Sequence, residues 1–123
     1  MSVFRVTIRL GSPDEARWLE VSAIVDTGAT LTKIPRSVAE ALGLLPRRKV
    51  KVVLGNRMEV WRDVARAIVE YGGVADVVPV AIGEDGEDPI LGATALEILG
   101  FAVDPVNETL TPAVHYELAA LSR

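Results

Sequence analysis

Segments with a two-residue hydrophobic period constrain the fold of this chain more than any other feature. In residues 3–10 every second side chain is apolar, and residues 17–25 repeat the pattern. Such alternation is typical of strands that are buried on one face. The sequence Gly-Ser-Pro-Asp at residues 11–14 favours a turn between them. The two segments are therefore predicted to form a hairpin.

Two further hairpins are predicted around glycine-containing dipeptides. They comprise residues 50–54 and 58–64 around Gly55-Asn56, and residues 65–70 and 74–82 around Gly72-Gly73. Both dipeptides suit the positive φ of a tight hairpin turn. Because Pro79 cannot donate a backbone hydrogen bond, its strand is expected to be an edge or to be bulged at that position.

Two short helices complete the predicted elements. Pro35 suits the first turn of a helix that stops at Gly43, and residues 93–99 suit a second helix that stops at Gly100. Two last strands are predicted at residues 101–103 and 109–114. No linker or low-complexity run divides the chain. We therefore predict an all-β fold with two minor helices, in a single domain of residues 1–123.

Composition limits the partners of this domain. The chain has 123 residues, half of them apolar, with 13 Lys and Arg against 17 Asp and Glu. The net charge of −4 provides no basic surplus, so we expect no nucleic-acid binding. No apolar run approaches the roughly 20 residues of a membrane span. The first ten residues alternate where a signal peptide would be continuously apolar. We therefore expect a cytoplasmic protein without a membrane partner.

Missing residue types limit the chemistry. The sequence has no cysteine and a single histidine, His115. Thiolate nucleophiles, cysteine-bound zinc and a zinc site built from several histidines are excluded within one chain. We therefore expect neither a metal nor another cofactor. Carboxylate chemistry remains.

One carboxylate stands in a distinctive position. Asp26-Thr27-Gly28 follows the apolar residues 23–25, and Ala29-Thr30 continues the motif. A carboxylate at the end of a rigid strand is well positioned, and glycine allows close approach of the backbone. Two such loops together would hold two carboxylates against one water. Because like charges at that distance resist double ionisation, the pair would contain both an acid and a base.

The Gly-Ala-Thr of this motif occurs twice. Residues 28–30 follow a predicted strand and lead toward a helix, and residues 92–94 follow Ile90-Leu91 and lead into the second helix. Structural duplication would explain the repeat, and so would chance in a chain rich in these residues.

These motifs resemble the retroviral-type (retropepsin-like) aspartic protease family, with its cellular and prokaryotic relatives. The resemblance lies in Ala-Ile-Val-Asp-Thr-Gly-Ala-Thr at residues 23–30, in Ile-Leu-Gly-Ala-Thr-Ala-Leu at residues 90–96, and in the order of hairpins. It implies a closed acid-protease β-barrel that forms a C2 homodimer. Asp26 would be the catalytic aspartate, Thr27 would form a hydroxyl grip between subunits, and Gly28 and Ala29 would support the loop.

The resemblance also implies two further parts of the site. The flap over the substrate would be the hairpin turn of Leu54, Gly55, Asn56 and Arg57. The second loop, which precedes the C-terminal helix, would consist of Ile90, Leu91 and Gly92.

The function implied is an aspartic endopeptidase that cleaves extended polypeptides with water held between Asp26 and its copy in a second subunit. The sequence departs from viral members at Thr30 and Leu31, where those proteins carry acidic side chains, and in residues 116–123, which extend the C-terminus. A non-catalytic dimerisation or peptide-binding module on the same fold is the alternative. An unrelated small β-barrel with a fortuitous motif is a weaker one.

Three other features have simpler interpretations. Trp61 is expected to pack against its neighbours more than to line a groove. Asp85, Glu87 and Asp88 are interpreted as a solvated loop in preference to a cation site. The basic run at residues 47–49 is interpreted as a surface connection.

Overall fold

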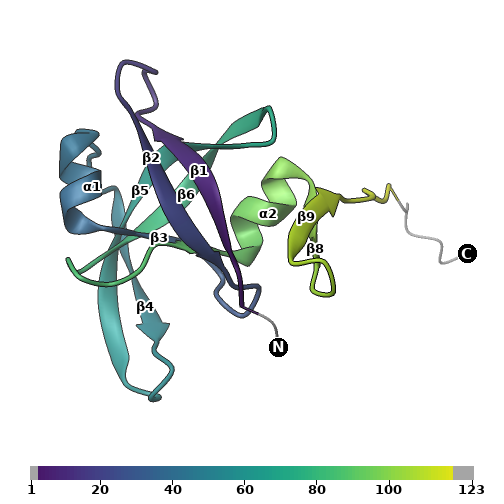
Figure 1. Cartoon of the computed structure of the whole chain (residues 1–123). Helices are drawn as coiled ribbons and strands as arrows, with labels where there is room; N and C mark the ends of the chain where they lie inside the picture. Colours follow the sequence, from purple (N-terminus) through teal and green to yellow (C-terminus); the bar gives the residue numbers. More distant parts are fainter. Residues whose placement is uncertain (1–2, 118–123) are drawn as a thin grey trace, which may run out of the picture.

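The computed structural model describes residues 3–117 and consists mainly of strands (Figure 1). The strands are β1 (Arg5–Gly11), β2 (Trp18–Val25), β3 (Thr32–Pro35), β4 (Arg48–Val53), β5 (Glu59–Tyr71), β6 (Val74–Gly83), β7 (Ile90–Leu91), β8 (Phe101–Asp104) and β9 (Thr109–Pro112). The helices are α1 (Arg36–Ala41) and α2 (Ala93–Leu99). The predicted all-β class is confirmed, as are the hairpin of β1 with β2 and both short helices.

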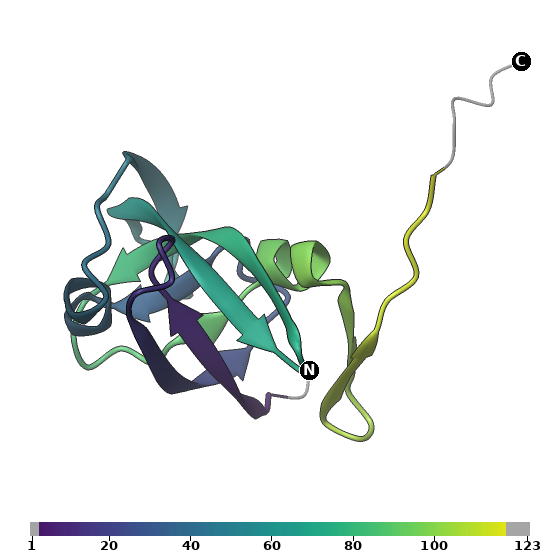
Figure 2. The same cartoon turned by 90° about the horizontal axis from the view of Figure 1, so that it is seen from above.

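Seven strands form one sheet in the order β1-β2-β7-β3-β6-β5-β4, and β1 pairs with β5 as well. The pairings thus return from β5 to the first strand and surround an apolar core. Its most deeply buried members include Ile8, Leu10, Ile34, Val80 and Leu91. Strands β8 and β9 form a separate two-stranded sheet, and Figures 1 and 2 show it on the far side of α2 from the main sheet.

Strand β5 is one continuous strand of 13 residues, whereas the sequence predicted two segments that divide after Val64. Its first half pairs with β4, and its second half pairs with β6 and, over three residues, with β1. A strand has two edges, so one strand serves both predicted hairpins. The β6 ladder begins at Asp63, so residues 59–62 pair with β4 alone. This part of the hairpin projects from the sheet (Figure 1).

Strand β3 was not predicted from the sequence. Pro35, expected in the first turn of a helix, instead ends β3 in an extended conformation and α1 begins at Arg36. The partners of β3 are β6 and β7, which follow it by more than 40 residues, so no local pattern reveals it. At Pro79, β6 pairs with β5 only, because the β3 ladder begins at Val80. β6 lies between β3 and β5 and is not an edge strand as a whole, but at Pro79 it is paired on one side only, which agrees with the expectation for that position.

The hairpin turns differ in how they use glycine. Gly72 and Gly73 have the positive φ predicted for them, 58° and 82°. The same expectation for Gly55-Asn56 is wrong, because the positive φ of that turn, 68°, falls on Arg57. The Arg57 N–H donates to the Leu54 carbonyl at 2.8 Å, so the left-handed residue is the one that closes the turn. Gly43 and Gly100 end α1 and α2 with positive φ, as predicted.

No helix within residues 3–117 is long and apolar enough to cross a membrane. The cytoplasmic location and the single domain of residues 1–123 stay predictions. Residues 118–123 of the C-terminal extension lie outside the described residues.

The turns at Gly55 and Gly73 provide a matched test of which turn residue has a positive φ. A Cβ at Gly73 or at Gly55 would meet no atom within 4 Å, but only Gly73 has a positive φ. Gly73→Ala should therefore lower the free energy of unfolding by about 1 kcal/mol or more. Gly55→Ala should leave it unchanged or raise it by up to about 1 kcal/mol. Urea unfolding measures both, and an equal loss in the two variants would contradict the turn geometry.

Candidate active site

Asp26 lies at the end of β2, where the sheet gives way to a loop. Its backbone N–H donates to the Leu91 carbonyl at 3.1 Å, and its carbonyl accepts the Ala29 N–H at 3.2 Å. Its carboxylate Oδ1 accepts the Gly28 N–H at 2.8 Å. The side chain is thus fixed by its own loop. Among the described residues, Oδ2 has no hydrogen-bond partner, so one oxygen of the carboxylate is available to a water or to a second chain.

The residues after Asp26 have different exposures. Thr27 and Gly28 are exposed, whereas Ala29 is half-buried. A Cβ at Gly28 would lie 3.1 Å from Asp26 Oδ1, so a larger residue would press on the carboxylate. Within one chain, the loop presents the Thr27 side chain to solvent. The hydroxyl grip implied by the family resemblance requires a partner chain and stays a prediction.

The second predicted loop lies directly against the first. Strand β7 runs parallel to β2, with Ile90 beside Ile24 and Leu91 beside Val25. At the start of α2, the Ala93 N–H donates to the Ala29 carbonyl at 2.8 Å and the Thr94 N–H donates to the Thr30 carbonyl at 3.0 Å. The first N–H groups of a helix have no partner within it. The Asp26 loop supplies these partners, and the two Gly-Ala-Thr segments thereby pair in space.

Gly92 is the point of closest approach between the loops. A Cβ at this position would lie 2.6 Å from the Leu31 carbonyl oxygen and 2.8 Å from that of Ala29. Real side chains do not occupy such distances, so this contact requires glycine. The Gly92 N–H donates to the hydroxyl of Thr32 at 3.1 Å. Thr32 is only 1% exposed and was not identified from the sequence, where it stands between Leu31 and Lys33 without a pattern that marks it as buried.

The flap candidates form the tip of the projecting β4–β5 hairpin. Leu54, Gly55, Asn56 and Arg57 make its turn, and the Asn56 side chain accepts the Met58 N–H at 3.0 Å. The tip and the Asp26 loop both lie at the lower end of the molecule in Figure 1. Within residues 3–117 no hydrogen bond joins them. The flap role of these four residues therefore stays a prediction.

Trp61, in the β5 arm of this hairpin, is 63% exposed, so it lies outside the core, and the packing expected for it is limited to a neighbouring side chain. Its ring faces Lys51, whose Nζ lies 5.4 Å from the ring centroid. Trp61 is exposed because it lies opposite Lys51 in the part of the β4–β5 hairpin that projects beyond the core.

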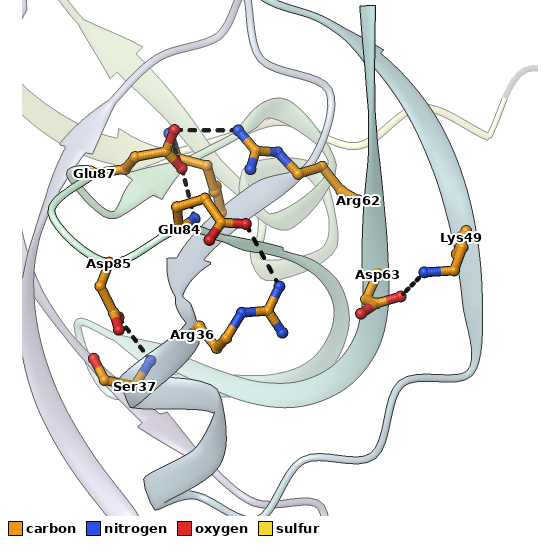
Figure 3. Close-up of polar contacts among 9 residues, drawn as sticks. Arg36, Ser37, Lys49, Arg62, Asp63, Glu84, Asp85 and Glu87 are labelled. Atoms are coloured by element: carbon orange, nitrogen blue, oxygen red, sulfur yellow. Dashed lines mark hydrogen bonds and ion pairs between the residues drawn. The ribbon is translucent and has the colours of Figure 1, made fainter.

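The acidic loop of residues 84–88 is held by protein partners (Figure 3). Glu87 contacts the Arg62 guanidinium at 3.2 Å and the Lys33 ammonium at 3.7 Å. The other three carboxylates of the loop are also engaged: Glu84 with Arg36 at 3.6 Å, Asp85 with the Ser37 N–H at 2.9 Å, and Asp88 with Arg5 at 2.9 Å. Within residues 3–117 no three acidic or histidine side chains are arranged to hold a metal ion.

This loop connects the stem of the β4–β5 hairpin to the second loop. Arg62 of β5 is 8% exposed, so its charge is largely withdrawn from water and depends on Glu87. Partial burial raises the pKa of Glu87, but the Glu84 N–H and the charges of Lys33 and Arg62 outweigh this effect and hold that pKa below its ordinary value. Pro89, directly after the loop, accepts the Ile24 N–H of β2 at 2.9 Å. The ion pairs of Glu87 and this backbone bond thus fix the position of the chain just before Ile90.

A comparison with protein families supports this arrangement. The family model described as aspartyl protease matches residues 6–95, which include both loops and the hairpin between them. The chain belongs to the aspartyl protease family.

Solved structures with the same fold are retropepsin-like. The EIAV protease in complex with the inhibitor HBY-793 aligns with a TM-score of 0.56 at 17% identity, over 79% of this chain and 88% of that one. The retroviral protease-like domain of Ddi1 from Leishmania major aligns at 0.59 with 20% identity, over 91% and 89%. A retropepsin-like aspartic protease from Rickettsia conorii aligns at 0.54 with 21% identity, over 89% and 91%. The comparison with curated proteins found no match.

The predicted resemblance to retropepsin-like proteases is therefore confirmed at the level of the fold. An unrelated small β-barrel, the weakest of the alternatives, is excluded by the family match.

The close contact at Gly92 gives the first test of the site. Gly92→Ala should lower the free energy of unfolding by about 1–3 kcal/mol, because both neighbouring groups are backbone and yield little. Gly28→Ala should cost less, since its nearest atom is a side-chain oxygen at 3.1 Å. Thermal unfolding of the two variants compares them, and a harmless Gly92→Ala would show that the loops are not in this contact.

The Arg62–Glu87 pair gives a second test. Glu87→Gln should lower the free energy of unfolding at pH 7 by about 1–3 kcal/mol, because it leaves a buried guanidinium without its carboxylate. Asp88→Asn, which breaks an exposed pair, should cost about 1 kcal/mol or less.

The same pair should depend on pH in a known direction. A carboxyl whose pKa is lowered by folding stabilises the protein above its unfolded pKa, near 4.5 for glutamate, and loses that effect as pH falls through the folded pKa. The difference between the parent and Glu87→Gln should therefore be full at pH 7 and shrink below about pH 4.5. A difference that grows toward low pH would contradict the assignment.

Proposed function

We propose that this protein is an aspartic endopeptidase in which Asp26 of two identical chains activates one water to hydrolyse a peptide bond. The observation that carries the proposal is the Asp26 loop, which holds one carboxylate oxygen by the Gly28 N–H and, within residues 3–117, leaves the other without a hydrogen bond. In this proposal the ring of strand pairings is the closed β-barrel of the family, and the active unit is a C2 homodimer.

The proposed dimer supplies the second carboxylate. The chain has one Asp-Thr-Gly motif, and the loop packed against it contributes Gly92 without an aspartate. In an isologous interface each Asp26 loop meets its own image across the axis, so the pair is symmetric. The exposure of Thr27 in the single chain supports a role for its hydroxyl in that contact.

The proposed reaction uses the two carboxylates in different protonation states. Two carboxylates at close range share one proton, because a second negative charge is disfavoured there. The ionised Asp26 removes a proton from the water as its oxygen attacks the substrate carbonyl, and the protonated Asp26 donates its proton to the carbonyl oxygen. The carboxyl group that took the water proton then gives it to the nitrogen as the C–N bond breaks. A hydroxyl of the tetrahedral intermediate returns its proton to the other carboxylate, so the pair again holds one shared proton. The hairpin tip at residues 54–57 would close over an extended substrate and exclude bulk water.

A non-catalytic dimerisation or peptide-binding module is the second candidate. Thr30 and Leu31 favour it, because they replace the acidic side chains that hold the substrate backbone in viral relatives. Such a module would bind an extended peptide by strand addition and leave it intact.

The catalytic role of Asp26 is tested by Asp26→Asn. The amide oxygen can still accept the Gly28 N–H, so the loop and the free energy of unfolding should be preserved. Peptide cleavage should fall by at least about 10²–10⁴-fold, because the shared proton is lost. The measurement is cleavage of a diverse peptide library from pH 3 to pH 8, read by mass spectrometry. Undiminished cleavage by the variant would assign the activity to another site. Binding without cleavage by the parent would favour the second candidate.

The proposed grip is tested by two substitutions of Thr27. Thr27→Ser keeps the hydroxyl, so sedimentation should show a dimer like that of the parent. Thr27→Val keeps the shape but leaves the partner groups unpaired, at a cost of about 1–3 kcal/mol for each group, so the dimer should dissociate at higher concentration. A Val variant that dimerises like the parent would exclude the grip.

A further inference from the structure

Basic side chains without a carboxylate partner are concentrated in one region of the molecule. Within residues 3–117, seven basic side chains form ion pairs with carboxylates: Arg5, Arg9, Lys33, Arg36, Lys49, Lys51 and Arg62. The described cations without such a pair are Arg17, Arg47, Arg48, Arg57 and Arg66. All of them except Arg57 line two grooves. In an acidic protein this distribution points to an anionic ligand from outside the chain.

The two grooves are adjacent. The first has a volume of about 610 Å³, and Arg47, Arg48 and Arg66 stand over a floor that includes Val64, Val77 and Pro79. The second, of about 440 Å³, shares Arg47 and Arg66 with it and adds Arg17. Asp14 also lines the second groove, where its carboxylate accepts the Ser12 hydroxyl and the Ala16 N–H. These bonds keep the pKa of Asp14 below its ordinary value. The negative charge there favours the first groove for an anion.

Strand register brings the arginines of the first groove together. Arg48 lies opposite Val64 in the β4–β5 ladder, and Arg66 is two residues further along β5 on the same face. Such diagonal neighbours have Cα atoms about 7–8 Å apart, which long side chains span easily. The backbone of Arg47 is fixed as well, because its N–H donates to the Val64 carbonyl at 2.8 Å. Three guanidinium groups can therefore converge on one ligand.

The lining favours a peptide over other anions. Single-stranded nucleic acids are held by aromatic stacking as well as by charge, and no aromatic residue is among the described residues that line either groove. A small inorganic anion would make no favourable contact with the apolar floor of the groove. Extended acidic peptides fit both features, because carboxylates pair well with guanidinium groups and alternate side chains can contact the floor.

We propose that the groove of Arg47, Arg48 and Arg66 binds an acidic, extended peptide segment in which glutamate or aspartate alternates with apolar residues. The carboxylates pair with the three guanidinium groups, and the apolar side chains contact Val64, Val77 and Pro79. None of the residues that line the groove belongs to the Asp26 loop or to the hairpin tip. The site is thus separate from the proposed catalytic centre and does not depend on the proposed function.

The test uses a fluorescein-labelled decapeptide of alternating glutamate and valine, with fluorescence anisotropy in the Asp26→Asn protein so that the probe stays intact. Arg48→Gln/Arg66→Gln should weaken binding by at least about 10-fold, or about 1.4 kcal/mol. Both side chains are exposed and form no ion pair, so the fold should be unaffected. Arg9→Gln, which removes a charge from neighbouring β1 outside both grooves, should change the affinity by less than about twofold. Binding should weaken as salt increases.

The Asp26→Asn protein is the parent in this test. A matched decapeptide with glutamine in place of glutamate should bind it no more tightly than the acidic probe binds the double variant. Chemical-shift changes in the Asp26→Asn protein should map to the residues of β4, β5 and β6 that line the groove. Equal affinity of the parent and the double variant, or of the two peptides, would overturn the proposal. Tighter binding of a single-stranded oligonucleotide, or displacement of the probe by an equal concentration of inorganic phosphate, would overturn the peptide assignment.

Discussion

The contact between Gly92 and the backbone of Ala29 and Leu31 determines the geometry of the candidate site. Because Gly92 has no Cβ, the two loops can approach until the carbonyls of Ala29 and Thr30 accept the first N–H groups of α2. The helix and the Asp26 loop therefore satisfy each other's backbone. Asp26 is held from two directions: its N–H donates to the Leu91 carbonyl of β7, and its carboxylate accepts the Gly28 N–H of its own loop. A carboxylate placed in this way loses little conformational freedom when a water or a second carboxylate meets it.

Strand β5 extends this constraint to the rest of the molecule. One half of the strand belongs to the core, with Ala65, Ala67 and Val69 buried, and the other half leaves the sheet with β4. Arg62 lies at the division, buried and paired with Glu87 in the loop that precedes Ile90. The stem of the projecting hairpin and the loop behind Asp26 are thus joined by an ion pair that is weakened in acid. Stability and geometry of the site are linked through the same few groups.

Local features of this fold could be predicted from the sequence, and long-range features could not. The positive φ of Gly72, Gly73 and Gly100 follows from glycine chemistry, and alternation revealed β1 and β2. Strand β3 was missed because its four residues are stabilised by strands far along the chain. The turn at Gly55-Asn56 was predicted in the right place, but its positive φ falls on Arg57, because the preferences of asparagine and glycine do not show which residue takes the left-handed position. Asp26 was found from its motif, but Thr32 and the Arg62–Glu87 pair depend on contacts that only the fold creates.

The central claim, that two copies of Asp26 act on one water, is tested most directly by mixing parent protein with Asp26→Asn in different ratios. After subunit exchange, each active site contains either two aspartates, one, or none. If both carboxylates are needed, peptide cleavage should fall as the square of the fraction of parent chains at constant total protein. A decrease that is linear or gentler than linear, or activity that sediments with a monomer, would show that one Asp26 suffices and would contradict the account.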